Sequence, residues 1–166
     1  MNGSALTLPN DVQSALVARL ERLKEDIAQS ISSHGLTASG RTASSMYVVA
    51  ESDNVTLYGR SFFAALETGS SAWTGRTGVP CTFYEFKEII RNWASSKGLN
   101  FGQARDYERA VGAIAMTIIR TGTKQKRSGR RLDVYTTLVN EATEDCAMIA
   151  ANVIGAQVDN VISQWS

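Results

Sequence analysis

Cysteine, histidine and proline are scarce in this chain, and their scarcity excludes several classes of protein. Its 166 residues include two cysteines, one histidine and two prolines. Cys81 and Cys146 lie far apart and outside any CxxC or Cys/His spacing, so we expect small buried thiols rather than a disulfide, a nucleophile or a zinc site. His34 has no second histidine with which to share a metal, and its place before Gly35 is typical of a helix end. The composition therefore supports neither a metalloprotein nor a disulfide-stapled domain.

Strong net charge and long hydrophobic runs are also missing. The formal net charge is +1, which gives no overall reason to bind nucleic acid or a membrane surface. No run of about 18 apolar residues could span a bilayer. The first residues, MNGSALTLPND, lack the basic segment and apolar core of a secretory signal. We therefore expect no membrane partner, and synthesis in a reducing cytoplasm.

Catalytic motifs are absent as well. The sequence contains no GxSxG, no GxxxxGK[ST] and no GxGxxG, and a hydrolase would have to use His34 as its base from a helix end. The carboxylate pairs Glu85/Glu88 and Glu141/Asp145 could each share a divalent ion on one helical face. Without convergent partners, a solvated face is the better interpretation of both pairs. We expect no enzymatic activity, no catalytic residue, no cofactor and no metal.

What the chain does contain is an ordinary globular composition. Hydrophobic residues make up 43% and charged residues 20% of the sequence, which argues against disorder. A chain of this length suits one domain, which can bury about 70% of its unfolded surface. We predict a single domain, 1–166, in which residues 1–9 form a polar leader arm and residues 10–163 form the core.

Local patterns predict an α+β fold. Apolar residues recur at three- and four-residue steps after Pro9 and again after Thr82, where Glu85 can complete a capping box. The strand-like segments MYVVA and VTLY flank the turn-forming ESDN, which predicts a small antiparallel sheet, a hairpin at about 46–58. Some strand character near the end leaves open whether the last quarter is all helix or returns to the sheet. The sheet is expected to pack against several helices, at 10–33, 60–67, 83–97, 100–119 and 134–163, of which the first and last are long.

Two loops are candidate interaction sites. The loop 70–82, SSAWTGRTGVPCT, is longer than connections usually are without a functional or interfacial reason. The loop 121–132 is basic, and its cations could contact nucleic-acid phosphates or an acidic partner, because closely spaced cations gain affinity by releasing counterions. No aromatic residues are interleaved with them, so an ordinary solvent-exposed loop is the favoured alternative. The cations are Lys124, Lys126, Arg127, Arg130 and Arg131.

Several short motifs between Ala38 and Leu99 resemble the small tail-completion and neck proteins of tailed bacteriophages. In that family a segment with "tG…S" leads into a strand pair, an aromatic helix ending in "(F/Y)…(L/V)E.G", a variable loop and a helix with "I..W…KG". The segments ASGRTASSMYVV, VTLYG, SFFAALETG and FKEIIRNWASSKGL follow this order. The stretch LDVYTTLVNEA, after Arg131, is similar to versions in the crAss-like group of phages that infect Bacteroidetes. The matching positions are Ser39, Gly40, Ser45, Phe63, Leu66, Glu67, Gly69, Ile90, Trp93, Lys97 and Gly98.

The resemblance implies a compact α+β fold and a structural, non-catalytic role. Such proteins assemble as rings between the capsid portal and the tail, or at the top of the tail tube. It therefore implies a six- or twelve-fold homo-oligomer in the virion neck or tail, with the portal and other neck or tail proteins as partners. Packaged DNA passing through the channel could be a further contact. The chain departs from the family in its last segment, which is predicted to be helical where family members often return to a strand.

The interface of such a ring is expected on the arms of the chain. These are the leader 1–9 and the loops 70–82 and 121–132. Within the first loop, Trp73, Arg76 and Val79 are the expected subunit contacts, since Trp and Arg dominate interface hot spots. The alternative function is a small nucleic-acid-binding module that uses the basic loop 124–131.

Overall fold

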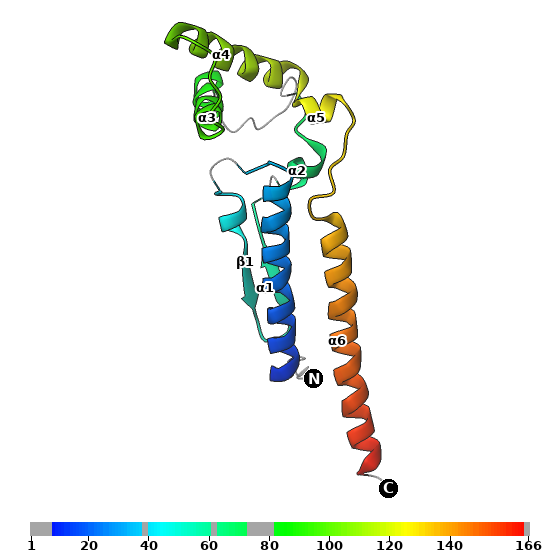
Figure 1. Ribbon diagram of the computed structural model, residues 1–166. Coiled ribbons are helices and arrows are strands. Elements are labelled where there is room, and N and C mark those ends of the chain that lie inside the picture. The colour runs from blue at the N-terminus through cyan, green and yellow to red at the C-terminus, as the bar shows by residue number, and fades with distance from the viewer. Residues whose placement is uncertain (1–7, 38–39, 61–62, 73–81, 165–166) are drawn as a thin grey trace. The chain divides into compact units, whose positions relative to one another are not determined.

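The described part of the chain folds into helices and one small sheet. The computed structural model describes residues 8–37, 40–60, 63–72 and 82–164. It is mostly helical (66%), and its described residues form six helices and a two-stranded antiparallel sheet, shown in Figure 1. This confirms the α+β class predicted from the sequence.

The described chain divides into two compact units. One comprises Met1–Gly35, Arg41–Arg60 and Val134–Ser166, and the other comprises Leu36–Gly40 and Ser61–Asp133. Both units are formed by segments that are discontinuous in sequence, and the single domain expected from the sequence stays a prediction. Each unit has apolar contacts of its own.

Helix α1, Asn10–Ser33, is the element of the first unit on which the others pack. It ends at Ser33, and the backbone N–H of the next residue, His34, donates to the Ser30 carbonyl oxygen at 3.1 Å. Gly35 follows with φ 65°, a conformation that suits glycine, so the helix ends where the sequence predicts. Apolar residues at three- and four-residue spacing bury one side of the helix. The buried ones are Val12, Leu23, Ile27 and Ile31.

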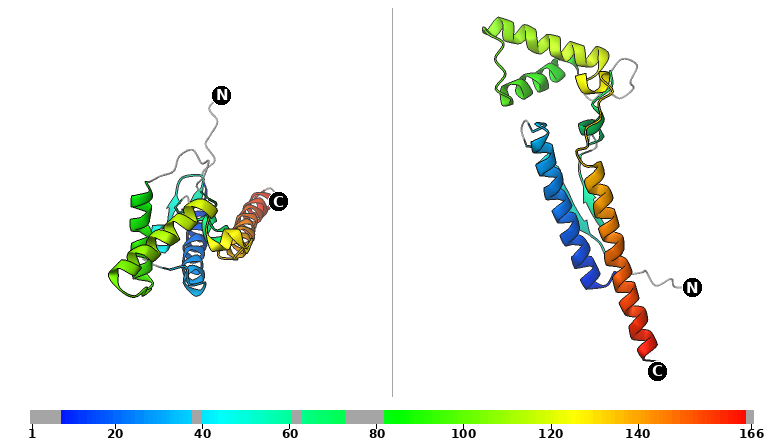
Figure 2. Two further views of the ribbon diagram at one scale, coloured as in Figure 1. Left: turned by 90° about the horizontal axis from the view of Figure 1, so that it is seen from above. Right: turned by 45° about the vertical axis from the view of Figure 1, so that its right-hand side comes forward.

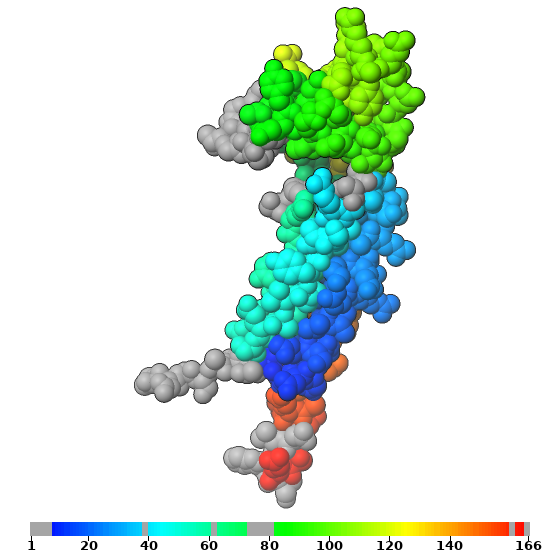
Figure 3. Space-filling view, turned by 90° about the vertical axis from the view of Figure 1, so that its left-hand side faces the viewer, coloured from blue at the N-terminus to red at the C-terminus, as the bar shows by residue number. Residues whose placement is uncertain are grey.

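A β-hairpin packs on α1, as the sequence predicts. Strands β1 (Tyr47–Ala50) and β2 (Val55–Tyr58) pair antiparallel, with Tyr47 opposite Tyr58. The two tyrosine rings stack with centroids 5.3 Å apart, a cross-strand contact that fixes the register. The 3-10 turn η1, Ala43–Ser45, precedes the hairpin and also contacts α1. In the space-filling view of Figure 3 the hairpin and α1 lie side by side.

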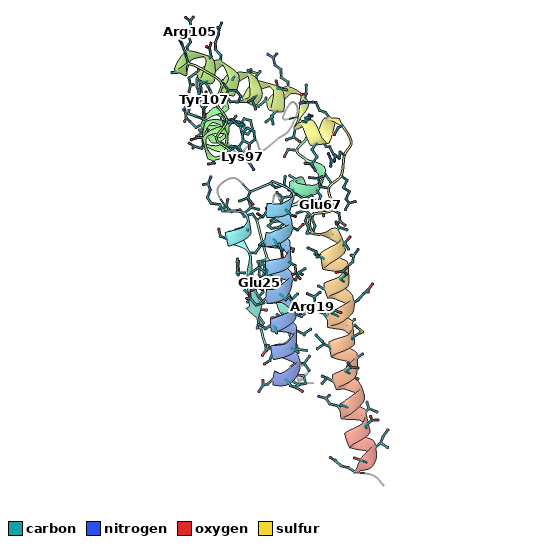
Figure 4. All side chains as sticks on the ribbon, viewed as in Figure 1. Arg19, Glu25, Glu67, Lys97, Arg105 and Tyr107 are labelled. Carbon is teal, nitrogen blue, oxygen red and sulfur yellow. The ribbon has the colours of Figure 1, made fainter. Side chains whose placement is uncertain are left out.

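Helix α6, Thr136–Ser163, runs antiparallel along α1 (Figures 1 and 2). It is helical to its end, so the last quarter of the described chain does not return to the two-stranded sheet. Arg19 of α1 points toward α6 in Figure 4, where its Nε donates to Asp145 Oδ2 at 2.7 Å. Residues spaced along one side of α6 are buried or half-buried: Leu138, Ala142, Cys146, Ile149 and Val153.

The second unit is built around a helix pair, α3 (Phe83–Ser96) and α4 (Ala104–Thr121). Two shorter helices, α2 (Ala64–Thr68) and α5 (Lys124–Arg127), accompany it. Small residues at the centre let α3 and α4 approach closely. The buried cluster is Ile90, Ala94, Val111 and Ala115, with Phe83, Phe86, Phe101, Tyr107, Ile114 and Ile118 packed around it.

The capping box predicted at the start of α3 is present. The Glu85 backbone N–H donates to Thr82 Oγ1 at 3.3 Å, and the Thr82 backbone N–H donates to Glu85 Oε2 at 2.6 Å. This bond to the Thr82 backbone, followed by the bond to its side chain, holds the pKa of the Glu85 carboxyl below its ordinary value. The reciprocal bonds satisfy two N–H groups that the helix itself cannot pair.

Three predicted segments differ from the structure by more than two residues. The helix predicted at 60–67 begins only at Ala64, and the helix predicted from Asn100 begins at Ala104. There the Asn100 side-chain oxygen accepts from the Gly102 N–H at 2.9 Å, and Gly102 has φ 87°, so a turn takes the place of the first helical turn. The predicted loop 121–132 contains the helical turn α5, because the Thr123 hydroxyl accepts from the Lys126 N–H and caps it.

Candidate interaction surface

The structure describes only one of the two predicted interaction loops in full. Trp73, Arg76 and Val79 of the loop 70–82 lie outside the residues that the structure describes, and their predicted role at a subunit interface stays a prediction. The loop 121–132 is described in full and belongs to the second unit. Its five cations can therefore be placed.

Two glycines allow the basic loop to lie close against the end of α2. Gly69 has φ 70°, and a Cβ there would lie 2.3 Å from Thr123 Oγ1. Gly122 has φ 80°, and its Cβ would lie 2.5 Å from the Ser70 carbonyl oxygen. This close approach allows the Thr123 backbone N–H to donate to the Ser70 carbonyl at 2.9 Å, and the Ser70 N–H to donate to Thr123 Oγ1 at 3.0 Å. The α2–α5 junction is thus a backbone contact that side chains at either glycine would block.

Glu67 is the buried polar residue at this junction. It is 1% exposed, and its Oε2 accepts from Arg131 Nη2 at 3.2 Å. Its backbone carbonyl accepts from the Leu132 N–H at 2.9 Å and from the Gln125 side chain. Figure 4 shows Glu67 on α2, near the segment that follows α5. Glu67 therefore joins α2 to both ends of the basic loop.

The five cations of the basic loop do not form one uniform patch. Arg127 Nη1 donates to Thr121 Oγ1 at 2.9 Å and to the Gly122 carbonyl at 2.8 Å, so it caps the end of α4. Arg131 pairs with the buried Glu67. The structure thus gives two of the five cations an internal structural role. Lys124, Lys126 and Arg130 are exposed.

An apolar groove runs between α3 and α4. It encloses about 650 Å³ and has a cationic end formed by Lys124 and Arg127. The sequence places Ile89 and Trp93 on the apolar face of α3, and both are exposed, Ile89 at 52% and Trp93 at 39%. They line the groove together with Ile114 and Ile118 of α4. The groove was missed because helical spacing identifies an apolar face without telling whether anything covers it.

Ion pairs on the exposed rim connect the same two helices. Glu108 accepts from Arg91 in two bonds of 2.8 Å and from Lys87 Nζ at 2.8 Å, while Arg91 also pairs with Glu88. The Arg91 guanidinium first, and then the Lys87 ammonium, holds the pKa of Glu108 at about 2. The same bonds raise the pKa of Arg91. Glu108 therefore stays ionised at any ordinary pH and fixes α4 to α3.

The predicted carboxylate pairs are occupied with other contacts. Glu85 caps α3, Glu88 pairs with Arg91, and Asp145 pairs with Arg19. Among the described residues, no group of three or more His, Cys, Asp or Glu side chains could hold a metal ion. In the same part of the chain, every helix is too short or too polar to cross a bilayer.

Comparison with models of protein families, with curated proteins and with solved structures finds no match to this chain. A function for this chain is therefore argued from the surface features of the two units and from the sequence motifs that resemble phage neck proteins.

Proposed function

We propose that this chain is a virion structural protein, a subunit of an oligomeric ring in the neck or tail of a tailed phage that joins the portal to the tail. It performs no catalytic step in this role. The observation that carries the proposal is the order of short motifs between Ala38 and Gly98, which follows that of tail-completion and neck proteins.

The places of the motif residues support a scaffold role. Glu67 is buried and paired with Arg131, and Ile90 belongs to the core of the second unit. Gly69 and Gly98 have φ 70° and 65° and follow the ends of α2 and α3. These residues shape the backbone and fill the core, as expected if the motif specifies a fold rather than a reaction.

Exposed apolar side chains give further support. A ring subunit covers apolar surface with its neighbours, and large exposed patches on a protein usually mark interaction sites. The described residues include such side chains in both units. They are Ile89 and Trp93 on α3, and Met148, Ile154, Val158 and Ile162 on α6.

The oligomeric state tests the proposal. The full chain is purified and its mass measured by size exclusion with light scattering, and its particles are imaged by negative-stain electron microscopy. We expect closed rings of six or twelve copies, and the same protein in virion necks labelled with a specific antibody. A strictly monomeric protein, in both isolated and virion-derived material, would contradict the proposal.

Nucleic-acid binding is the second candidate, favoured by the exposure of Lys124, Lys126 and Arg130. Binding to duplex DNA is measured by fluorescence anisotropy at several salt concentrations. If the chain binds DNA through this loop, its affinity for DNA falls as the salt concentration rises and is lost when these three residues are replaced by alanine. Arg127 and Arg131 are left unchanged because they hold α4 and Glu67. Absent or salt-independent binding removes this candidate.

A further inference from the structure

The outward side of α6 carries an apolar row that we call the α6 stripe: Ala147, Ala151, Ile154, Val158 and Ile162. Steps of three and four residues place these positions on one side of the helix, and all five are exposed. Ile154 is 62%, Val158 51% and Ile162 59% exposed. The side of α6 that faces α1 carries a different set of residues, so the stripe is not used in the first unit.

The end of α6 is also unusually poor in charge. Between Ala147 and Ser163 the only charged residue is Asp159. Figures 1 and 3 show this end continuing past the start of α1. A helix end in water normally carries a polar face with several charges. Its apolar stripe and low charge are those of a helix that lies against another surface.

The α3–α4 groove has the complementary character. Its walls are apolar, with the exposed Ile89 and Trp93 on one side and Ile114 and Ile118 on the other. An amphipathic helix that lays three or four apolar residues in such a groove is a recurrent mode of recognition. The stripe from Ile154 to Ile162 is about 12 Å long and presents three branched side chains at that spacing.

We propose that the α6 stripe of one copy binds in the α3–α4 groove of a second copy. Charge fixes the direction of binding. The groove has Lys124 and Arg127 at one end, while the stripe has Asp159 beside it. The carboxyl end of a helix also carries a partial negative charge that attracts cations. The end of α6 therefore lies toward Lys124 and Arg127.

This contact is heterologous, which has a consequence for assembly. Each copy uses its groove for one neighbour and its α6 stripe for another, so copies add head to tail and close into a ring if the rotation permits. Ring closure is the part of this inference that rests on the proposed function. The contact itself can be tested without reference to phage particles.

The first test uses one charged substitution on each surface of the full chain. Ile89→Glu blocks the groove and Val158→Glu blocks the stripe, and each is expected to weaken self-association about thirtyfold or more in sedimentation velocity. Tyr84→Glu, at a 78% exposed position of α3 outside the groove, and Asn152→Glu, on α6 outside the stripe, are the matched controls. Controls as disruptive as the test variants would overturn the proposal.

Mixing the two blocked proteins distinguishes this contact from its rivals. Each variant alone is expected to be monomeric, whereas an equimolar mixture forms dimers, since one intact groove meets one intact stripe and growth then stops. If α6 ends pair with each other, Val158→Glu disrupts association and Ile89→Glu does not. If residues 73–81 of the same chain occupy the groove, Ile89→Glu leaves association unchanged. Either of the last two results would overturn the proposal.

A charge exchange keeps the test valid if a blocked variant fails to fold, because Lys124 and Asp159 are both exposed. Lys124→Glu and Asp159→Lys are each expected to weaken association roughly two- to fivefold, and the double variant to restore it. No restoration would contradict the proposed direction of binding. If every one of these variants still forms rings, this inference is overturned and the proposed function is not. If the wild-type protein is a monomer at all concentrations, both are overturned.

Discussion

The α1–α6 pair of the first unit and the α3–α4 pair of the second place their polar contacts differently. Arg19 lies in the seam between α1 and α6, with its side chain 16% exposed, and its buried Nη1 has no partner among the described residues. The contacts of Glu108 lie on the rim of α3–α4, where its side chain is 41% exposed. A buried charge costs desolvation, whereas a rim pair is screened by water. In both pairs, apolar packing must therefore supply most of the stability.

The largest effect is expected from a core truncation in the first unit. Ile27 is 3% exposed, and Ile27→Ala should lower the free energy of unfolding by about 2–5 kcal/mol in urea titrations. Hydrogen exchange should show the loss of protection concentrated in α1, the hairpin and α6. Met148→Ala, at a 58% exposed position, is the control and should change little. Equal loss in α3 and α4 would mean that the two units unfold as one.

The next largest effect concerns the α2–α5 junction, which has no counterpart in the first unit. Gly122→Ala forces a side chain into positive φ and against the Ser70 carbonyl, and should cost about 2–3 kcal/mol. Gly129 also has positive φ, 65°, but a Cβ there would meet nothing within 4 Å. Gly129→Ala should therefore cost only about 1 kcal/mol. If thermal melts show the same loss of stability for Gly122→Ala and Gly129→Ala, the contact with Ser70 adds nothing to the cost of the substitution.

A double-mutant cycle on Arg19 and Asp145 measures the seam contact directly. Arg19→Met, Asp145→Asn and their combination should give a coupling free energy of about 1 kcal/mol, because the pair is half-shielded from water. The pair Lys24–Glu21 within α1, whose cation is 30% exposed against 16% for Arg19, is the reference, with an expected coupling of about 0.3 kcal/mol. Equal couplings would remove the distinction between seam and surface.

The smallest effect is the pH dependence of the rim contacts on Glu108. Its pKa is lowered from 4.5 to about 2, so its contribution is complete above about pH 4.5 and disappears as the pH falls to about 2. Glu108→Gln should therefore melt below the wild type at pH 7, with the two melting temperatures converging near pH 2. Added salt should also reduce the difference. A constant difference across this pH range would contradict the assigned pairing.

Patterns within one element were predicted well, because they depend on neighbours in sequence. The spacing of Val12, Leu23 and Ile27 predicts α1, and Thr82 with Glu85 predicts the start of α3. Both are present. The strand pair around ESDN is present with its expected antiparallel pairing.

Contacts between distant segments were not predicted, because periodicity identifies faces but not what they touch. Arg19 and Asp145 are 126 residues apart, and Glu67 and Arg131 are 64 apart. Ile89 and Trp93 have the spacing of a core face, yet no described residue covers them fully. The position of the basic loop depends on Gly69 and Gly122, whose φ values a sequence does not show.

The thiol of Cys146 offers a way to measure when α1 and α6 of the first unit separate. It is a free, half-buried thiol next to Asp145, and burial raises its pKa against the opposing effect of the Arg19 charge. Alkylating reagents attack the thiolate, so this sulfur should react slowly while α6 lies on α1 and rapidly once they separate. In a Cys81→Ser background, the rate of labelling at Cys146 would thus report how often the α1–α6 pair opens during assembly.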